Sequence, residues 1–190
     1  MNIGFAFCGS FCTYSAVFPV LERLCKEHSV TPIFSAASAS VDSRFGTARD
    51  FLARVETICG TQALQTLAEV EPIGPKKLLD LLIIAPCTGN TLAKLANSIA
   101  DGPVTMAAKS HLRNGRPILL AVSTNDALAG AAENIGKLLG RKHYYFVPFR
   151  QDSWEKKPTS LVADFSLIPT AAEAALEGRQ AQPLLLAGKP

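Results

Sequence analysis

The sequence predicts an α/β protein in which helices cover both faces of a parallel sheet, a doubly wound three-layer α/β/α arrangement. Three observations predict it. Apolar, strand-like runs alternate along the 190 residues with segments of helical period. The strand-like runs are apolar throughout, which is typical of strands buried on both faces. Four of these runs end in small or hydroxylated residues, at the place where ligands bind in open α/β sheets.

The first half of the chain shows two strands followed by short polar turns. The apolar run 3–7 stops at Gly9 and Ser10, and apolar residues then recur with helical spacing over 17–25. Residues 41–75 are less regular. The elements expected in this half are strands at 3–7 and 30–34, helices at 17–25, 48–59 and 64–70, and a turn at 72–75.

The second half continues the alternation. Gly140 and Gly178 stand where two helical periods stop, and we expect them to end those helices. Residues 150–163 are polar, carry two lysines and are expected to form a connection. The length favours one domain over residues 1–190, with the segment 150–190 packing back on it. The other elements expected are strands at 81–85, 117–122 and 144–149, helices at 91–100, 103–113, 127–139 and 168–176, and a turn at 113–116.

The composition excludes several classes of protein. With 48% hydrophobic and 18% charged residues the chain is an ordinary globular one, and its net charge of +3 gives no sign of a nucleic-acid partner. The longest unbroken apolar run, 81–86, is far shorter than the about 20 residues that cross a bilayer. The N-terminus lacks the features of a signal peptide. We therefore expect a soluble, cytoplasmic protein.

Disulfide and metal chemistry are not expected. Five cysteines are an odd number in a chain without secretory features, which favours reduced thiols. The spacing of Cys8 and Cys12, with only three histidines elsewhere, does not make a zinc pattern. We expect no metal site.

The ends of the four strands should meet in one crevice, because parallel strands share one carboxyl edge. Gly9 would let a phosphate approach the backbone at the start of a helix. The turn has neither the GxGxxG nor the Walker pattern, and a plain turn with Ser10 as N-cap explains it equally well. The four strand ends are Gly9-Ser10, Ser35-Ala36, Cys87-Thr88-Gly89 and Ser123-Thr124-Asn125.

The turn 88–91 carries the strongest signal. Thr88, Asn90 and Thr91 place a hydroxyl, an amide and a second hydroxyl directly after a buried strand. Asn97 and Asp101 follow about two and three helical turns after Asn90, so we expect them on the same helix face. Contact with a ligand is favoured over simple capping here, because several loops converge.

The same segment supports a resemblance to a known family. The stretch APCTGNTLAKLANSIADGPVT at 85–105 resembles the signature PAS-A-N-T-(I/L)-A-K-(I/L)-A-N-G-I-A-D-x-L of the homo-oligomeric flavin-containing cysteine decarboxylase superfamily. FAFCGSFCTY resembles the first strand and Gly-Ser turn of that superfamily, and GRPILLAVSTNDAL takes the place of its Pro-x-Met-Asn-x-x-Met strand end. The resemblance implies a flavodoxin-like fold, FMN as the cofactor with NADP as the alternative, and assembly into trimers or dodecamers.

The resemblance also implies roles for individual residues. Gly9, Ser10 and Ser35 would contact the FMN phosphate and ribityl chain. The turn 88–91 would hold the end of the ribityl chain or the edge of the ring, and Asn125 falls where the superfamily has its motif asparagine. The implied cofactor-binding residues are Gly9, Ser10, Ser35, Thr88, Asn90, Thr91, Ser123 and Asn125.

The chain departs from the decarboxylase pattern in two places. Decarboxylases of the superfamily have a catalytic histidine in the segment corresponding to about 45–75, and this chain has none between His28 and His111. The two methionines of the strand-end motif are replaced by Thr124 and Leu128. Because proton abstraction needs a positioned base, the departures argue against a decarboxylase.

The segments 87–117, 122–139 and 160–186 resemble most closely a group of sporulation flavoproteins within the superfamily. These act with a second subunit that resembles NADP-dependent dehydrogenases, and together the two oxidise a dihydrodipicolinate-type precursor to pyridine-2,6-dicarboxylate. The resemblance implies an oxidoreductase that is active with its partner in the mother cell of a sporulating bacterium. Two alternatives stay open: a stand-alone FMN-dependent decarboxylase or prenyltransferase, and a non-catalytic assembly module with a vestigial pocket.

The catalytic residue is not identified by these patterns, and Asn125 and Cys87 are the candidates. Cys87 could be a nucleophile if a helix start lowered the pKa of its thiol, and the alternative is a small residue at the edge of the core. Trp154 lies in a loop that could act as a lid. A dicarboxylate substrate needs cations, although lysines 156 and 157 equally fit a solvated surface. The candidate cations are Arg113, Arg116, Arg150, Lys156 and Lys157.

Overall fold

A seven-stranded sheet forms the centre of the computed structural model, which describes residues 1–188. The strand order within these residues is β2-β1-β3-β4-β7-β6, and β5 also pairs with β4. Strands β1 to β5 run parallel, whereas β7 is antiparallel to both β4 and β6. The strands are β1 (Asn2–Phe7), β2 (Ser29–Phe34), β3 (Leu81–Cys87), β4 (Ile118–Thr124), β5 (Tyr144–Phe146), β6 (Phe149–Arg150) and β7 (Leu161–Ala163).

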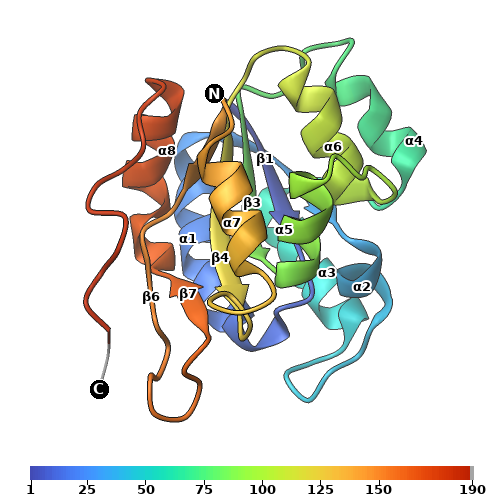
Figure 1. Cartoon of the computed structure of the whole chain (residues 1–190). Helices are drawn as coiled ribbons and strands as arrows, with labels where there is room; N and C mark the ends of the chain where they lie inside the picture. Colours follow the sequence, from blue (N-terminus) through green and yellow to red (C-terminus); the bar gives the residue numbers. More distant parts are fainter. Residues whose placement is uncertain (189–190) are drawn as a thin grey trace.

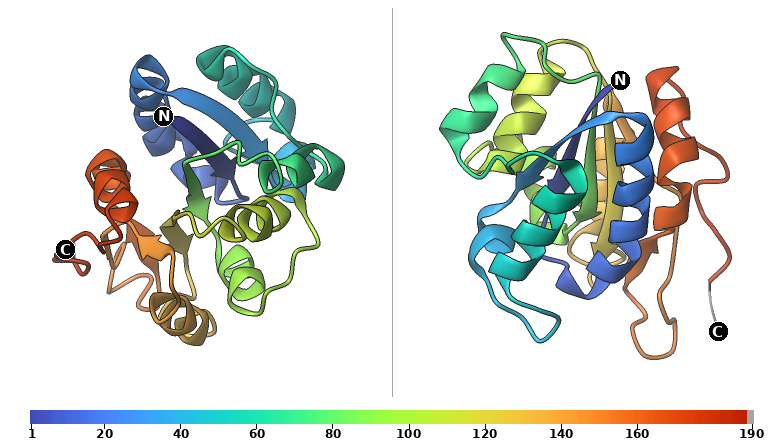
Figure 2. Two further views of the ribbon diagram at one scale, coloured as in Figure 1. Left: turned by 90° about the horizontal axis from the view of Figure 1, so that it is seen from above. Right: turned by 180° about the vertical axis from the view of Figure 1, so that it is seen from behind.

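Helices cover both faces of the sheet, as predicted (Figure 1, Figure 2). One layer contains α1, α3 and α8, and the other contains α5, α6 and α7. The fold is thus the flavodoxin-like three-layer arrangement, with an antiparallel edge added to a mostly parallel sheet. The helices are α1 (Tyr14–Glu27), α2 (Ala36–Ser40), α3 (Ala48–Cys59), α4 (Leu67–Val70), α5 (Gly89–Ala96), α6 (Pro103–Leu112), α7 (Ala132–Leu139) and α8 (Ile168–Leu176), with 3-10 turns η1 (Phe11–Thr13), η2 (Glu71–Ile73) and η3 (Phe165–Leu167).

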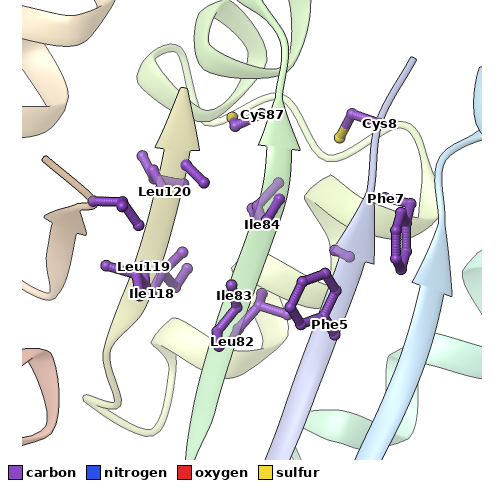
Figure 3. Close-up of a cluster of buried hydrophobic side chains, with 14 of the residues drawn as sticks. Phe5, Phe7, Cys8, Leu82, Ile83, Ile84, Cys87, Ile118, Leu119 and Leu120 are labelled. Carbon is purple, nitrogen blue, oxygen red and sulfur yellow. The ribbon is translucent and has the colours of Figure 1, made fainter. Parts of the chain in front are cut away.

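The central strands are buried over almost their whole length, which explains why their sequences do not alternate. Every residue of β3 is buried, and Ile83 and Leu119 on neighbouring strands have no exposed surface. Figure 3 shows these apolar side chains, with Cys8 and Cys87 at the carboxyl ends of adjacent strands. Fully burying one such aliphatic side chain stabilises the fold by about 1.5–3 kcal/mol. No helix within residues 1–188 combines the length and the apolar character that a membrane span needs.

The strand order reverses at β1. The chain passes from β1 to β2 on one side, and β3 then pairs with the other side of β1. The connections after β1 and β3 therefore lead to opposite faces of the sheet, and they open a crevice at its carboxyl edge.

The helix predicted at 91–100 is shorter than expected, because its carbonyl groups find other partners. Helix α5 ends at Ala96, and the Asn97 side chain donates to the Ala93 carbonyl (2.8 Å) as a cap. The guanidinium of Arg141 donates to the Leu95 carbonyl (3.1 Å) and the Ala96 carbonyl (2.7 Å). Asp101 therefore lies beyond the helix, and the expectation that it shares the helix face of Asn90 is wrong. Asn97 stands at the helix end as the C-cap residue.

The helix predicted at 127–139 begins later, at Ala132. The backbone N–H of Leu128 donates to the carbonyl of Thr159 (2.9 Å) instead of entering a helical ladder. The Thr159 hydroxyl in turn donates to the Asn125 carbonyl (2.7 Å). The turn after β4 is thus tied to the segment that was expected to be a polar connection.

That segment, 150–163, is a hairpin whose strands belong to the sheet, which its polar composition does not indicate. Strand β7 pairs with the end of β4, with Ser123 opposite Val162, and β6 pairs with β7. The strand predicted at 144–149 is interrupted by Val147 and Pro148, so that it contributes to both β5 and β6. The C-terminal segment packs against this edge, where the Phe149 N–H donates to the Leu184 carbonyl (3.0 Å).

Candidate functional site

The crevice at the carboxyl edge of the sheet consists of two adjoining hollows. The first, of about 460 Å³, lies between the starts of α2 and α5 and is called here the α2–α5 hollow. The second, of about 430 Å³, is walled by the 150–163 hairpin and is called the hairpin hollow. Gly9 and Thr88 line both, so the two hollows meet at the point where the strand order reverses.

The crevice gathers all eight residues predicted to bind a cofactor. They come from the ends of β1, β2, β3 and β4, which are far apart in sequence. Ser10 and Ser123, 113 residues apart, are joined by a hydrogen bond between their hydroxyls (2.7 Å). The α2–α5 hollow holds Gly9, Ser35, Thr88, Asn90 and Thr91, and the hairpin hollow holds Gly9, Ser10, Thr88, Ser123 and Asn125.

Two of these residues are helix caps as well as crevice residues. The Ser35 hydroxyl accepts the N–H of Ser38 (3.2 Å) at the start of α2, and the Thr88 hydroxyl accepts the N–H of Thr91 (3.3 Å) at the start of α5. The remaining N–H groups of a first helical turn have no partner within the helix. Capping and ligand contact are therefore compatible here, because the cap brings the helix start to the crevice.

Thr91 connects Thr88 to the end of β1. Thr91 is buried, and its hydroxyl donates to the sulfur of Cys8 (3.3 Å). The same hydroxyl lies 3.1 Å from the Thr88 hydroxyl. Burial raises the pKa of the Cys8 thiol to about 11, so this sulfur stays protonated near neutral pH. The crevice wall formed by Cys8, Thr88 and Thr91 is therefore uncharged. Of the two threonines, Thr88 is the more exposed.

The charged groups of the crevice are paired. The Lys94 ammonium lies 2.9 Å from Asp101 in the α2–α5 hollow, and the Lys157 ammonium lies 2.6 Å from Asp152 in the hairpin hollow. The hydrogen bond from Lys94 lowers the pKa of Asp101, and the hydrogen bond to Asp152 raises the pKa of Lys157. An anion would therefore be met mainly by N–H and hydroxyl groups. No arginine lines either hollow within the described part of the chain.

Most of the cations predicted for a dicarboxylate lie elsewhere. Of the five, Lys157 lines the crevice and the other four do not. Arg116 is bound to the Leu79 carbonyl and to Asp80, and Arg150 is paired with Asp164. Lys156 is exposed, as the solvated-surface interpretation predicts. Trp154 is half-exposed at the hairpin and lines neither hollow, so it does not close the crevice in this conformation.

The side chains of Asn90 and Asn125 are available to a ligand. Both residues are exposed, and neither side-chain amide forms a hydrogen bond to the residues that the structure describes. Gly89 precedes Asn90 at the start of α5. A Cβ atom there would come within 2.8 Å of the Asp126 carboxylate and 2.9 Å of the Thr124 hydroxyl, so any other residue would require these two side chains to move.

The structure favours Asn125 over Cys87 as a residue that can touch a reactant. Cys87 has no exposed surface and lines neither hollow, and burial raises the pKa of its thiol well above the usual value. A buried thiol of high pKa lacks both the access and the thiolate that a nucleophile needs. Among the described residues no histidine lines the crevice: His111 is buried in α6, and His28 and His143 lie outside both hollows.

Several crevice residues were not found from the sequence. Asp152 and Ser160 were not singled out, and Lys157 was named only as one of five candidate cations. All three reach the hairpin hollow because β7 pairs with β4, and no local pattern indicates that pairing. Lys94 was not singled out either, and it lines the α2–α5 hollow as an ion pair with Asp101 across the end of α5. Lys94 and Asp101 both lie in the signature stretch 85–105, and that position was the sequence signal that could have indicated a place in the site.

Comparisons with known proteins identify relatives that cover almost the whole chain. The model of a family described as Flavoprotein matches residues 1–146. The B subunit of dipicolinate synthase from Bacillus subtilis (strain 168) is 44% identical over 186 residues, which cover 97% of this chain and 93% of the relative. A crystal structure of the dipicolinate synthase B subunit from Bacillus halodurans C is 41% identical, with a TM-score of 0.90 over 99% of this chain and 97% of the other. The resemblance seen in the sequence is thereby confirmed.

A solved structure of lower sequence identity shares the same fold. The FMN-dependent cysteine decarboxylase SpaF is 22% identical, with a TM-score of 0.68 over 92% of this chain and 97% of the other. At this identity the likeness concerns the fold alone. Because one fold can carry different chemistries, the reaction has to be argued from the residues of the crevice.

Proposed function

The chain belongs to the Flavoprotein family, and from that membership and its crevice we propose that it binds FMN and acts as a dipicolinate synthase B subunit. In this role it oxidises a dihydrodipicolinate-type precursor to pyridine-2,6-dicarboxylate together with an NADP-dependent A subunit. The similarity to the Bacillus proteins supports this reaction, its place in sporulation and a location in the mother cell. The proposal includes assembly into a homo-oligomer, a trimer or a dodecamer.

One observation carries the proposal: eight residues from four strand ends surround two hollows that meet at Gly9 and Thr88. An elongated cofactor with a phosphate at one end and a planar ring at the other fits two connected hollows better than one. The α2–α5 hollow offers the start of a helix and the Ser35 hydroxyl to the phosphate end. The hairpin hollow offers Ser10, Ser123 and Asn125 to the ring and to the substrate beside it.

The same donors favour FMN over NADP. The 2′-phosphate of NADP is commonly held by an arginine, and no arginine lines either hollow within residues 1–188. The turn after β1 also lacks the glycine pattern of dinucleotide-binding sites. NADP would then bind to the A subunit, and the B subunit would contribute the flavin.

Bound FMN would supply two-electron oxidation chemistry. The residues of the chain bind and orient the reactants. The Asn125 amide can donate to a substrate carboxylate, and Lys157, paired with Asp152, lines the same hairpin hollow. The Cys8–Thr91–Thr88 contacts hold the turn 88–91 in one position. Within residues 1–188 no histidine lines the crevice that could take the precursor's proton.

The proposal is tested first by binding. The purified full chain should quench the fluorescence of added FMN in a saturable way and should leave NADP unbound. Thr88→Ala should weaken FMN binding at least tenfold. Thr47→Ala is the matched control, because the Thr47 hydroxyl caps α3 in the same way, accepting from Asp50 N–H (3.1 Å), and lines neither hollow. Both variants should lose about 1 kcal/mol of stability from the missing cap.

The reaction is tested with the partner. The chain mixed with an A subunit, the precursor and NADP should form pyridine-2,6-dicarboxylate, detected by its ultraviolet absorbance, and neither protein alone should do so. Failure to bind FMN would contradict the cofactor and favour an assembly module. Turnover of a cysteinyl or prenyl substrate by this chain alone would favour the stand-alone enzyme instead.

A further inference from the structure

A third hollow, separate from the crevice, lies between α5, α6 and the start of β5. Its volume is about 520 Å³, and Leu95, Leu112 and Tyr144 form its apolar floor. It lies on the other side of the 97–102 connection from the α2–α5 hollow, and Thr105 is the one residue that lines both. We call it the basic hollow. The volume is within the about 300–1,000 Å³ typical of small-molecule sites.

The basic hollow is lined by four cations and by no carboxylate within residues 1–188. The cations are Lys109 and Arg113 at the end of α6, and Arg141 and Lys142 before β5. The side chains of Lys109, Arg113 and Lys142 form no ion pair or hydrogen bond with the described residues. The crevice differs, because both of its lysines are paired with aspartates. The basic hollow therefore has an uncompensated positive charge on its rim.

The fourth cation is part of the framework. Arg141 is held by two carbonyls at the end of α5, so it fixes the wall between α5 and β5. Tyr144 is buried on the floor, and burial raises the pKa of its phenol to about 12. The phenol is thus a neutral donor at physiological pH, and its oxygen forms no hydrogen bond with the part of the chain that the structure describes. An apolar floor with a hydroxyl donor beneath a cationic rim matches a molecule that is apolar at one end and anionic at the other.

We propose that the basic hollow binds a small amphipathic carboxylate, a ring that carries one or two carboxylate groups. The ring packs on Leu95, Leu112 and Tyr144, and the carboxylates face Lys109 and Arg113. Arginine suits this role because its guanidinium can bind a carboxylate through two parallel hydrogen bonds. The proposal does not depend on FMN binding, since the linings of the basic hollow and the crevice share only Thr105.

Benzene-1,3-dicarboxylate is the probe, because it presents an aromatic ring and two carboxylates without the metal-chelating nitrogen of a pyridine. Calorimetry on the full chain should show saturable binding that weakens as salt is raised. The double variant Lys109→Glu/Arg113→Glu should bind at least tenfold more weakly. Lys26→Glu is the matched control, since Lys26 is an exposed lysine in the last turn of α1 and lies outside the basic hollow, and it should change the affinity less than twofold. Inorganic phosphate should bind at least tenfold more weakly than the probe, because it has no apolar part.

Four results would overturn the proposal. The double variant could retain the affinity of the original chain while thermal unfolding shows that it is folded. FMN could displace the probe, which would place the probe in the crevice. Phosphate could bind as tightly as the probe, which would remove the role of the apolar floor. Light scattering could show that the original chain is an oligomer that the double variant breaks, with no probe bound by either, which would make the hollow a contact between copies.

Discussion

Lowering the pH from 7 to 5 should destabilise the protein through His111. This residue has no exposed surface, and its Nε2 lies 3.0 Å from the Pro117 carbonyl. Because a carbonyl only accepts, Nε2 carries the proton and Nδ1 does not. Nδ1 is buried without a hydrogen-bond partner among the described residues. Protonation would place a charge and an unsatisfied N–H in the interior, and burial accordingly lowers the pKa of His111 to about 4.

The size of the effect follows from the two pKa values. Above pH 6.5, the ordinary pKa of histidine, the imidazole is neutral in both the folded and the unfolded chain, and the stability is fully present. Below pH 6.5 the unfolded chain takes up a proton first, so stability is lost as the pH falls toward 4. At about 1.36 kcal/mol per pKa unit the complete loss is about 3 kcal/mol, and the loss at pH 5 is about 2 kcal/mol.

Urea unfolding at pH 7 and pH 5 measures how much free energy of unfolding the original chain and each histidine variant lose between the two pH values. His111→Gln keeps an N–H donor for the Pro117 carbonyl but cannot titrate, so it should lose about 2 kcal/mol less than the original chain over this interval. His28→Gln, which changes a partly exposed histidine at the end of α1, should keep the original dependence. An equal pH dependence in the original chain and His111→Gln would show that this histidine is not the cause. An NMR titration of the His111 ring with its midpoint near 6.5 would contradict the lowered pKa directly.

Two glycines with opposite surroundings give further predictions. Gly89→Ala should lower the free energy of unfolding by about 1–3 kcal/mol and weaken FMN binding, because the added Cβ would press on the ends of the Thr124 and Asp126 side chains at the crevice. Unchanged FMN fluorescence titrations would show that this contact does not shape the site. Gly136 lies inside α7, and nothing lies within 4 Å of a Cβ added there. Gly136→Ala should therefore raise the free energy of unfolding by about 0.5–1 kcal/mol in urea titrations. A lower free energy of unfolding would mean that the helix is packed more tightly than the structure shows.

Where the signals were local, the prediction of the fold was correct. The helices at 48–59 and 168–176 have the bounds expected from their sequences, and Gly178 follows the latter with a positive φ of 74°. The buried strands were recognised because a run such as 81–85 has no polar position that could face water. Local pattern is sufficient in these cases, since propensity and burial favour the same structure.

Where long-range contacts competed with local ones, the prediction was wrong. Residues 127–131 have a helical composition, but the N–H of Leu128 is bound to the hairpin instead. The helix predicted to reach Ala100 stops at Ala96, where Arg141, 45 residues away, donates to the last carbonyl. The sequence pattern near a helix end does not reveal a partner of this kind.

Which segments become buried strands could be read from the order of the amino acids, and so could the hydroxyl and amide side chains that directly follow four of them. Their meeting was predictable as well, because parallel strands share one carboxyl edge. The folded chain was needed to show that a polar hairpin pairs with β4 and closes the second hollow with Lys157, and that four cations gather around a separate apolar floor. Strand pairing and clusters of surface charge of this kind depend on residues far apart in the chain. The packing of the whole fold brings these residues together, and no periodic pattern in the sequence indicates it.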